Sequence, residues 1–507
     1  MLYGDWVGRW GRSFPRAEAL VDIPRNRRYT YGSLRDEVHR MANFLRSGLQ
    51  IGKGDRVAVL ALNRAEYIIL FFATSRLGAI LVPLNFRLAV NEFIYYLEDS
   101  TPKAFFFDKD HSSVVAELKS KVTIPHYVCF DEEKSCGQSL PSIWEKLSAE
   151  PPPEVHLVAD DPQLIIYTSG TTGLPKGVIM SYGMITWNSI NTNMGWGLRR
   201  GERTILHSAL FYTAGWNVFT LPLFHSLGTN ILIQRFEADL VLDLIEQERI
   251  TVFFAVPTMY QMMIESPKFK TTDCSSIWFM VSGGAPLTEK IFETFKREKN
   301  IHLWEGYGLT EVGPNCFLAN GKLKTVGHPM PHADVKLIDA QGNEVASGQE
   351  GELLLRGDHL CSGYLNKPEA TAEAIKDGWF HTGDLVRIDE DGHLSIVGRK
   401  KDMLISGGIN IYPAEIERVL ETHPQVNAAA VIGVPDEKWG EVGKVVVELK
   451  PGGSLTLEEL QKFLGDRMAK YKVPKYMVVV DKLPRTVAAE KVQKFILKER
   501  YGRADNK

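Results

Sequence analysis

The chain of 507 residues is too long for one compact core, and its length suggests two to four domains. Hydrophobic residues make up 44% and charged residues 24%, which is ordinary for a globular protein, and the net charge of −3 gives no support to nucleic-acid binding. The five cysteines are scattered and form no CxxC pair, so we expect neither a disulfide framework nor a zinc site.

The N-terminal stretch MLYGDWVGRWGRS has no apolar segment of the kind that signal peptides carry. The most apolar stretch, residues 67–84, is interrupted by Ser75 and Arg76 and is too short to span a bilayer. We therefore expect a cytoplasmic enzyme without an integral membrane segment.

Short apolar runs alternate with helical patterns up to about residue 330. RVAVLAL (56–62), AILVPLN (79–85) and AFFFD (104–108) predict strands, and AEYIILFFATSRLG predicts a helix between the first two. The alternation returns from residue 163 in the runs TILHSAL, TNILIQ, VFFAVP and IWFMVSGG. This pattern predicts a large α/β body of parallel strands with crossover helices.

The sequence changes character after residue 335. VKLID, GELLLRG and HLSIVG predict strands of a smaller β-rich unit, because turn-rich pieces such as DAQGN separate them. After GRKKD (398–402), two helical patterns and the strands AAAVIGVPD and KVVVELK predict a compact C-terminal domain. We predict an N-terminal domain at residues 1–398, a hinge at 399–402 and a C-terminal domain at 403–507.

The stretch YTSGTTGLPKGV, residues 167–178, follows the apolar run LII and is rich in glycine, hydroxyl groups and one lysine. Glycine lets backbone N–H groups approach an anion closely, and Lys176 adds a point charge. These groups suit a polyphosphate, although Gly/Ser/Thr loops are often plain turns. The stretch is not a Walker A loop, because its lysine precedes a glycine.

Four more motifs follow in order: GYGLTE (306–311), HTGDL (381–385), GRKKDMLISGGINIYPAEIE (398–417) and LPRT…KVQK (483–494). With YTSGTTGLPKG, the chain resembles the adenylate-forming superfamily, which includes acyl-CoA and aryl-CoA synthetases, nonribosomal peptide adenylation domains and firefly luciferase. The resemblance covers about residues 20 to 500. It implies an α/β fold in which a large N-terminal domain of two α/β subdomains and a β-rich unit precedes a hinge and a small mobile α+β domain.

The resemblance also implies a reaction in two halves. A small-molecule carboxylic acid attacks the α-phosphate of ATP, giving an acyl-adenylate and pyrophosphate, and the thiol of CoA then attacks the adenylate. Because an anion approaches an anion in the first half, charge neutralisation and positioning matter more than a base. The expected cofactors are ATP, Mg²⁺ and CoA, and the oligomeric state is open, with a homodimer as one option.

The residues that this resemblance assigns to ATP come from five stretches of the sequence. The phosphate loop comprises Thr168, Ser169, Gly170, Thr171, Thr172, Gly173 and Lys176, and the lysine stabilises the departing pyrophosphate. Thr310 contacts the α-phosphate and Glu311 binds Mg²⁺, which prefers carboxylate oxygens. The adenine site comprises Gly283, Gly284, Ala285, Tyr307 and Gly308, with Tyr307 as the stacking face. Asp384 accepts hydrogen bonds from the ribose hydroxyls, and Arg399 shares that ribose.

The catalytic lysine of the family falls in LPRTVAAEKVQK, where relatives read close to PRTxxGK. Counting forward from LPRT reaches Glu490, and counting back from KVQK reaches Lys491. We predict Lys491, because a glutamate beside the reacting carboxylate would oppose the reaction. The loop is one residue longer and lacks the glycine, so we expect slower adenylation.

For the second half, the resemblance assigns the hinge to Lys401 and the approach to the pantetheine arm to Gly407 and Gly408. Trp439 corresponds to an aromatic residue that contacts the adenine of CoA in aryl-CoA ligases. Tyr471 and Lys475 fall at similar nucleotide-contacting places, and lysine suits the phosphates of CoA.

Acid specificity is expected in ALFYTAGWNVF (209–219) and around residues 282–309. Tyr212 stands where relatives often have histidine, and Tyr212, Trp216 and Gly308 are the predicted pocket residues, although core packing is the alternative for the aromatics. The stretch has no cationic cluster, so an apolar acid is favoured over a dicarboxylate. Because WNVFTLPLF (216–224) resembles the corresponding stretch of medium- to long-chain fatty acyl-CoA synthetases, we predict a medium- to long-chain fatty acid, with an aryl or cinnamic acid left open.

Three other functions remain open from the sequence. The acyl group could pass to a carrier-protein thiol, although Trp439 favours free CoA. A luciferase-like oxygenase shares the same motifs. A non-catalytic protein that binds acyl-nucleotides is favoured only by the altered VAAEK stretch.

Overall fold

The computed structural model describes residues 4–132, 137–168, 175–318, 322–406, 409–465, 467–485 and 492–504. The chain divides into two units. The first comprises Met1–Val335 and Leu355–Phe380, and the second comprises Lys336–Leu354 and His381–Lys507. The predicted boundary after residue 398 and the hinge at 399–402 stay predictions.

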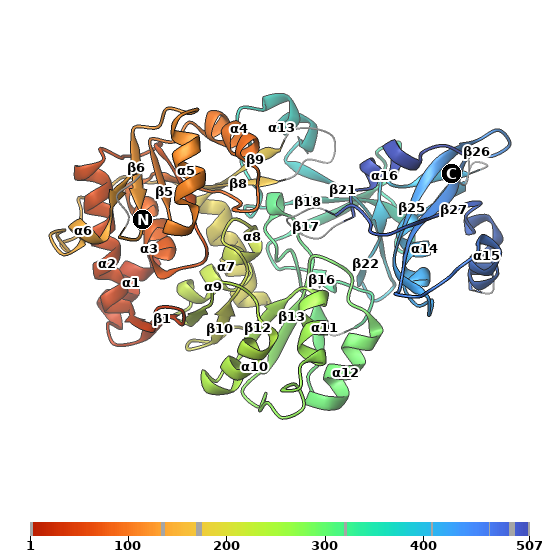
Figure 1. Cartoon of the computed structure of the whole chain (residues 1–507), viewed down its shortest axis with the longest axis horizontal. Coiled ribbons are helices and arrows are strands. Elements are labelled where there is room, and N and C mark those ends of the chain that lie inside the picture. The colour runs from red at the N-terminus through yellow and green to blue at the C-terminus, as the bar shows by residue number, and fades with distance from the viewer. Residues whose placement is uncertain are drawn as a thin grey trace. The chain divides into compact units, whose positions relative to one another are not determined.

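The largest sheet of the first unit has eight strands (Figure 1). They are β3 (Arg56–Leu60), β4 (Ile80–Pro83), β5 (Ala104–Phe107), β6 (His126–Cys129), β7 (Gln138–Ser139), β8 (Pro162–Thr168), β9 (Lys176–Ser181) and β19 (Gly363–Tyr364). Their order is β19-β9-β8-β4-β3-β5-β6-β7. The pairs from β8 to β7 are parallel, as the sequence predicts, whereas β9 and β19 are added antiparallel.

Both faces of this sheet are covered by helices because its strands are apolar on both sides. Val57 and Val59 face one core with α2 (Tyr31–Asn43) and α3 (Ala65–Leu77). Ala58 and Leu60 face another core with α4 (Val90–Ser100) and α5 (Ser112–Lys119). The strand alternation therefore builds a three-layer arrangement.

Two smaller sheets complete the α/β part of the first unit. The first has the strand order β10-β11-β1-β2 and comprises β10 (Arg203–Leu206), β11 (Thr229–Leu232), β1 (Glu18–Asp22) and β2 (Arg27–Thr30). The second is parallel and comprises β12 (Val252–Ala255), β13 (Phe279–Ser282) and β14 (Leu303–Glu305). Helices α10 (Ala238–Gln247), α11 (Pro257–Glu265) and α12 (Glu289–Lys299) pack over them around one core (Figure 1).

The first unit also contains further helices and several short strands. The helices are α1 (Trp6–Ser13), α6 (Pro141–Trp144), α7 (Tyr182–Gly195), α8 (Thr213–Asn217), α9 (Thr220–His225) and α13 (Pro368–Ala374). The strands are β15 (Phe317–Leu318), β16 (His328–Pro329) and β20 (Ile375–Lys376), and η3 (Thr310–Val312) is a 3-10 turn. The three strands predicted after residue 335 are present as β17 (Asp334–Ile338), β18 (Glu350–Arg356) and β22 (Leu394–Arg399); with the unpredicted β21 (Trp379–Ile388), they lie largely in the second unit.

The second unit contains a sheet of order β24-β23-β26-β25, with β27 paired to β26. Its strands are β23 (Leu404–Ser406), β24 (Ile409–Ile411), β25 (Val426–Asp436), β26 (Gly440–Leu449) and β27 (Tyr476–Val480). Helices α14 (Pro413–Leu420) and α15 (Leu457–Gly465) pack on one face, and α16 (Lys494–Tyr501) packs on the other. Both strands and both helices predicted from this part of the sequence are present.

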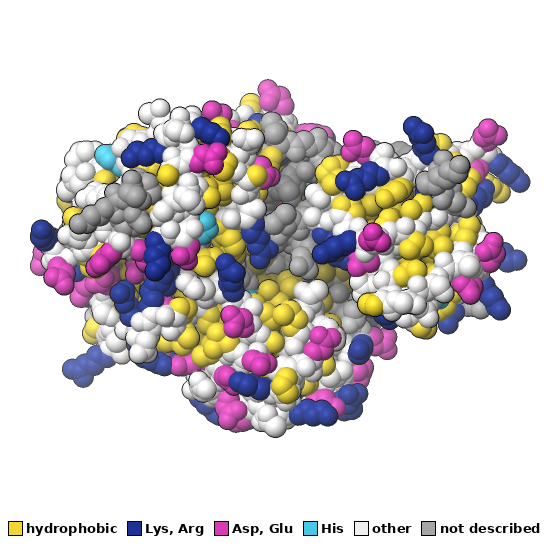
Figure 2. Space-filling view, viewed as in Figure 1, with side chains coloured by type: hydrophobic (Ala, Val, Ile, Leu, Met, Phe, Trp, Pro, Cys, Tyr) yellow, Lys and Arg dark blue, Asp and Glu magenta, His cyan; other side chains and the backbone are white. Residues whose placement is uncertain are grey.

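The apolar stretch at residues 67–84 belongs to the core of the first unit. Its helix, α3, is buried at every residue except Glu66, and Arg76 forms an ion pair with Asp5 at 2.8 Å. Within the described ranges, no helix combines the length and apolarity needed to cross a membrane. On the face shown in Figure 2, lysine and arginine side chains are interspersed with acidic ones over the first unit.

Candidate active site

The glycine-rich stretch connects two antiparallel strands. Thr168, the last residue of β8, lies in register opposite Lys176, the first residue of β9, and its hydroxyl donates to the Lys176 carbonyl at 3.5 Å. The strand pair thus holds both ends of the predicted phosphate loop together. Five residues predicted to bind phosphate lie outside the described residues: Ser169, Gly170, Thr171, Thr172 and Gly173.

Tyr364 joins Lys176 and Glu311 into one cluster. Strand β19 pairs with β9 and places Tyr364 opposite Val178. The Lys176 Nζ lies 4.8 Å from the centroid of the Tyr364 ring, and the Tyr364 hydroxyl donates to Glu311 Oε1 at 3.1 Å. The backbone N–H of Cys361 also donates to the Glu311 carbonyl at 2.8 Å. A cation and a carboxylate are therefore both fixed by one phenol ring.

The phenol of Tyr364 stays protonated, because burial raises its pKa and the neighbouring Glu311 carboxylate raises that pKa further. It can therefore act only as a donor toward Glu311. Sequence reasoning missed this residue, since a Gly-Tyr pair in a turn-rich stretch is a weak local signal. Its proximity to Lys176 follows from the pairing of β19 with β9, two strands that are far apart in the sequence.

The two predicted walls of the adenine site leave neighbouring parallel strands at their carboxyl ends. Ser282 at the end of β13 pairs with Glu305 at the end of β14, and the Gly306 N–H donates to the Ser282 carbonyl at 2.7 Å. The stretches beginning at Gly283 and Gly306 are therefore adjacent. The carboxyl end of a parallel sheet is the usual position of ligand sites in α/β proteins.

Two glycines in these stretches are required for different structural reasons. Gly284 has a φ of +82°, which favours glycine, and it is exposed together with Ala285. At Gly308 an added Cβ would lie 2.4 Å from the Pro314 backbone. The ring of Tyr307 packs edge-on against Phe317 with centroids 5.6 Å apart, so the turn holds this half-buried ring in place. The structure therefore brings the predicted adenine-site residues together.

The two predicted pocket aromatics lie in different environments. Tyr212 precedes α8 and is half-buried, and burial raises its pKa. Within the described part of the chain, its hydroxyl has no hydrogen-bond partner. Trp216 is fully buried, stacks on Phe71 with centroids 4.6 Å apart, and donates from Nε1 to the Leu210 carbonyl. The alternative of core packing therefore describes Trp216, whereas Tyr212 keeps a polar group that a ligand could engage.

The predicted ribose-binding residues of the second unit form an ion pair. Asp384 on β21 is in register with Arg399 on β22, and the Arg399 Nε lies 2.6 Å from Asp384 Oδ1. The Asp384 N–H donates to the Thr382 hydroxyl oxygen at 3.0 Å. Lys401 follows closely, and its pKa is lowered chiefly by burial, with the Arg399 charge adding to the effect. The carboxylate of Asp384 is thus buried and held in one orientation.

The predicted CoA-binding residues lie on the surface of the second unit. Asp436 accepts from the Trp439 N–H at 2.9 Å and pairs with Lys475 Nζ at 2.9 Å. The Lys475 Nζ lies 5.7 Å from the centroid of the Trp439 ring, which is 42% exposed. Tyr471 is also exposed, in a separate 3-10 turn (Lys470–Lys472). Gly407, Gly408 and Lys491 lie outside the described residues.

Comparison with protein families gives two matches. The model described as AMP-binding enzyme matches residues 7–365, and that described as AMP-binding enzyme C-terminal domain matches residues 415–489. The first alone covers more than half of the chain.

Among curated proteins, the feruloyl-CoA synthase of an Amycolatopsis species is 38% identical over 98% of this chain and 99% of its own. The indoleacetate–CoA ligase of Aromatoleum aromaticum is 35% identical over 97% of both chains, and the long-chain-fatty-acid–CoA ligase FadD13 of Mycobacterium tuberculosis is 34% identical over 96% of both. The solved structure of ATP-bound MatB from Rhodopseudomonas palustris superposes with a TM-score of 0.89 at 30% identity, covering 99% of each chain.

Proposed function

Because the chain belongs to the AMP-binding enzyme family, we propose that it is an ATP-dependent ligase that joins an aryl carboxylic acid to CoA through an acyl-adenylate. The observation that carries the ligase chemistry is the cluster of Lys176, Tyr364 and Glu311 beside the phosphate loop. The feruloyl-CoA synthase and the indoleacetate–CoA ligase support an aryl acid over the fatty acid that the sequence alone predicts.

In the proposed first half-reaction, the acid carboxylate attacks the α-phosphate of ATP and pyrophosphate leaves. Lys176 neutralises the leaving pyrophosphate, and the hydroxyl of Thr168 and the loop that follows it hold the β- and γ-phosphates. Thr310 contacts the α-phosphate. Positioning and charge neutralisation of this kind lower the barrier without a general base.

Glu311 is the residue that would hold Mg²⁺. Its carboxylate is a hard oxygen donor, and the Tyr364 hydroxyl bound to Oε1 orients it, as outer groups orient metal ligands elsewhere. When bound with ATP, Mg²⁺ supplies charge neutralisation at the phosphate oxygens. The donor chemistry of Glu311 therefore fits the ion.

The second unit supplies the other proposed contacts. The buried Asp384 carboxylate, oriented by Arg399, suits the two hydroxyls of a ribose. Lys491 is proposed as the lysine of the adenylation step. For CoA, the exposed Trp439 ring suits adenine stacking, and Lys475 beside it suits a phosphate.

A fatty-acid–CoA ligase is the second candidate. The 34% identical long-chain-fatty-acid–CoA ligase favours it, and the apolar stretch around Tyr212 is compatible with an acyl chain. The two candidates share every step and differ only in the acid.

The test is AMP release from ATP and Mg²⁺, with and without CoA, across cinnamic, benzoic and arylacetic acids and straight-chain acids of increasing length. CoA-dependent AMP release that is fastest with aryl acids is expected. Preference for a straight-chain acid would establish the second candidate instead. AMP release without any dependence on CoA would contradict the ligase.

A further inference from the structure

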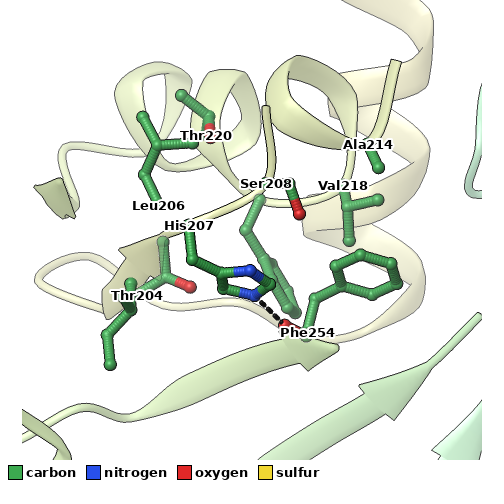
Figure 3. A pocket seen from close by; sticks show the side chains of 10 residues that line it. Thr204, Leu206, His207, Ser208, Ala214, Val218, Thr220 and Phe254 are labelled. Atoms are coloured by element: carbon green, nitrogen blue, oxygen red, sulfur yellow. Dashed lines mark hydrogen bonds between the residues drawn. The ribbon is translucent and has the colours of Figure 1, made fainter. Parts of the chain in front are cut away.

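A small cavity lies beside the predicted acid-binding stretch (Figure 3). It is lined by the end of β10, by α8 and the segment leading into α9, and by Phe254 of β12. Ala214 and Val218, which belong to the stretch 209–219, are among its walls. An added Cβ at Gly283 would meet the Phe254 ring at 3.2 Å, so one phenyl ring separates the cavity from the adenine-site motif.

His207 has a fixed position in this cavity. Its side chain packs against Phe236 and Phe253, with ring centroids 5.5 Å and 5.3 Å away, and the residue is only 5% exposed. Its Nε2 lies 2.6 Å from the Phe254 carbonyl oxygen, as the dashed line in Figure 3 marks. Because a carbonyl oxygen can only accept, Nε2 must carry the hydrogen.

The other ring nitrogen of His207 is therefore an acceptor without a donor. Nδ1 is buried and has no hydrogen-bond partner among the residues that the structure describes. Burial lowers the pKa of His207 to about 4, so the ring is neutral near pH 7 and Nδ1 presents a lone pair. A buried polar atom of this kind normally has a partner, since leaving it unpaired costs free energy.

The size and lining of the cavity limit what that partner can be. The cavity volume is about 10 Å³, which is room for one hydroxyl-sized group. His207 is the one ionisable side chain among the ten residues that line the cavity, so nothing there would neutralise a charged ligand group. A neutral O–H donor meets both conditions.

We propose that His207 Nδ1 accepts a hydrogen bond from a hydroxyl group at the end of the aryl acid remote from its carboxylate, so that the enzyme selects hydroxyaryl acids. This inference rests on the proposed function and names the substrate class within it. A site built to bind a hydroxyl discriminates strongly against the analogue that lacks it, because the buried acceptor is then left unpaired.

The experiment compares kcat/KM for 4-hydroxycinnamic and cinnamic acids in the full-length enzyme with MgATP and CoA. The two acids differ by one hydroxyl group. In the unaltered enzyme the hydroxylated acid is expected to be favoured at least about tenfold. Because both acids are measured on the same protein, their ratio is independent of how much of a variant is folded.

Two substitutions separate the two nitrogens of the ring. His207→Asn keeps a polar group near the position of Nδ1, and its amide oxygen can still accept. His207→Gln keeps a donor near Nε2 for the Phe254 carbonyl but places no acceptor at the position of Nδ1. We expect His207→Asn to retain most of the preference and His207→Gln to reduce it to within about threefold.

His225→Gln is the matched control. His225 is also a largely buried histidine, but its Nδ1 already lies 2.8 Å from the Ser189 hydroxyl oxygen. The preference should be unchanged in this variant.

An unchanged ratio in His207→Gln would overturn the proposal and leave the cavity as the site of a bound water only. Equal use of both acids by the unaltered enzyme, alongside CoA-dependent turnover, would overturn it as well while preserving the ligase. Absence of CoA-dependent turnover with every acid class would overturn the proposed function itself, and this inference with it.

Discussion

The Tyr364 phenol contacts both charged groups of the phosphate site, and each contact uses a different part of it. The hydroxyl donates to Glu311, and the ring face lies under the Lys176 ammonium group. The first contact orients a carboxylate, and the second restrains a flexible lysine. A substitution that removes only the hydroxyl of Tyr364 therefore affects the orientation of Glu311 and keeps the ring contact with Lys176.

Tyr364→Phe removes the hydroxyl and keeps the ring. We expect kcat/KM for MgATP to fall about tenfold, because one hydrogen bond to a charged group is lost, with the Mg²⁺ concentration for half-maximal rate rising. Pyrophosphate release as a function of Mg²⁺ measures both. Tyr127→Phe is the control, since it deletes a hydroxyl that bonds only the Val122 carbonyl at 3.1 Å. An unchanged Mg²⁺ dependence would contradict the positioning role.

The sequence predicts the functional roles of some residues better than those of others. Lys176 and Glu311 lie in dense local motifs, and their chemistry can be inferred from residue type and spacing. Tyr364 and His207 cannot be found that way, because each depends on neighbours from distant strands. Trp216 shows a different limitation: the sequence predicted it as a pocket residue, but it is buried in the core. An aromatic residue that lines a pocket cannot be told from one that packs in a core by residue type alone.

The turn after β14 depends on the absence of a side chain at Gly308. Gly308→Ala would place Cβ 2.4 Å from the Pro314 backbone, so we expect the free energy of unfolding to fall by about 1–3 kcal/mol and the KM for ATP to rise. Denaturant unfolding and ATP titration are the measurements. Gly52→Ala is the control, because a Cβ added there would meet no described atom within 4 Å. Equal stability of the two variants would contradict this packing.

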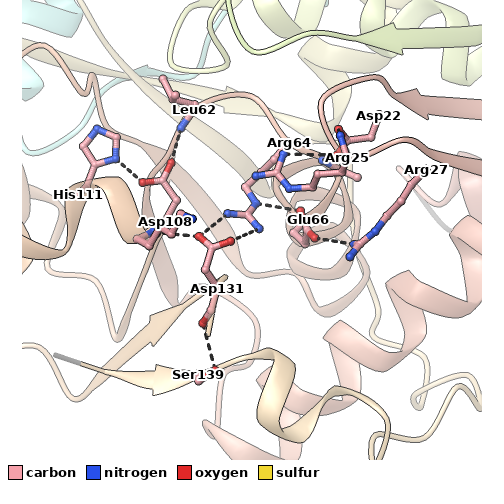
Figure 4. A network of polar contacts seen from close by, with 12 residues as sticks. Asp22, Arg25, Arg27, Leu62, Arg64, Glu66, Asp108, His111, Asp131 and Ser139 are labelled. Carbon is pink, nitrogen blue, oxygen red and sulfur yellow. Dashed lines mark hydrogen bonds and ion pairs between the residues drawn. The ribbon is translucent and has the colours of Figure 1, made fainter. Parts of the chain in front are cut away.

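The start of α3 is tied to its neighbours by a buried ion network (Figure 4). Arg64 pairs with Glu66 at 2.8 Å and with Asp131 at 2.9 Å. Burial alone raises the pKa of Glu66 and of Asp131, but the Arg64 guanidinium outweighs it and leaves both pKa values lowered. Such groups stabilise the fold above their ordinary pKa, and that stabilisation is lost as the pH falls through the lowered values.

Arg64→Met removes the buried cation that Glu66 and Asp131 share, and leaves Glu66 paired with the exposed Arg27 at 3.1 Å. We expect the free energy of unfolding to fall by about 3–5 kcal/mol at pH 7. The difference in Tm between the variant and the unaltered protein should decrease as the pH falls toward 3, because the carboxylates become protonated. The pKa of the neighbouring Asp22 is raised by burial. Asp22 is present in both the variant and the unaltered protein, so its titration does not contribute to the difference in Tm between them. The control Arg28→Met breaks exposed ion pairs and should cost under about 1 kcal/mol. A gap that does not change with pH would contradict the network.

Most strands of the fold were predictable because they are uniform apolar runs between turn residues. The predicted runs match β3, β4 and β5 within a few residues. The pair β1 and β2 was not predicted, because β2 is largely polar and β1 is paired with β11 from a distant part of the chain. Local pattern identifies strands, whereas pairing depends on the tertiary fold.

For the molecule as a whole, the predicted membership of the adenylate-forming superfamily is confirmed by both family matches and by the MatB structure. The prediction that the chain is an AMP-forming acid–thiol ligase agrees with the curated relatives named above, such as the feruloyl-CoA synthase and the indoleacetate–CoA ligase. The preference for a fatty acid was less well supported than its aryl alternative. An apolar aromatic stretch suits both acids, so composition could not decide between them.

A hinge at Lys401 would affect the two half-reactions unequally. Lys401→Pro fixes φ near −65° at this position. We expect CoA-dependent turnover to fall more than about tenfold, while acid-dependent ATP–pyrophosphate exchange changes less than about threefold. Lys400→Ala, which removes an ion pair to Glu352 without restricting the backbone, is the control. An equal fall in both reactions would contradict the hinge.

The position of β1 has a consequence for biosynthesis. Thr229 donates to the Glu18 carbonyl across 211 residues, and β1 lies between β2 and β11 in its sheet. A ribosome adding about 5–20 residues per second needs roughly 10–40 s to deliver the partner strand. During that interval the edge of β1 that later pairs with β11 is unpaired. The backbone N–H and C=O groups of an unpaired edge strand can pair with another nascent chain. Newly made chains should therefore depend on chaperones until β11 has emerged.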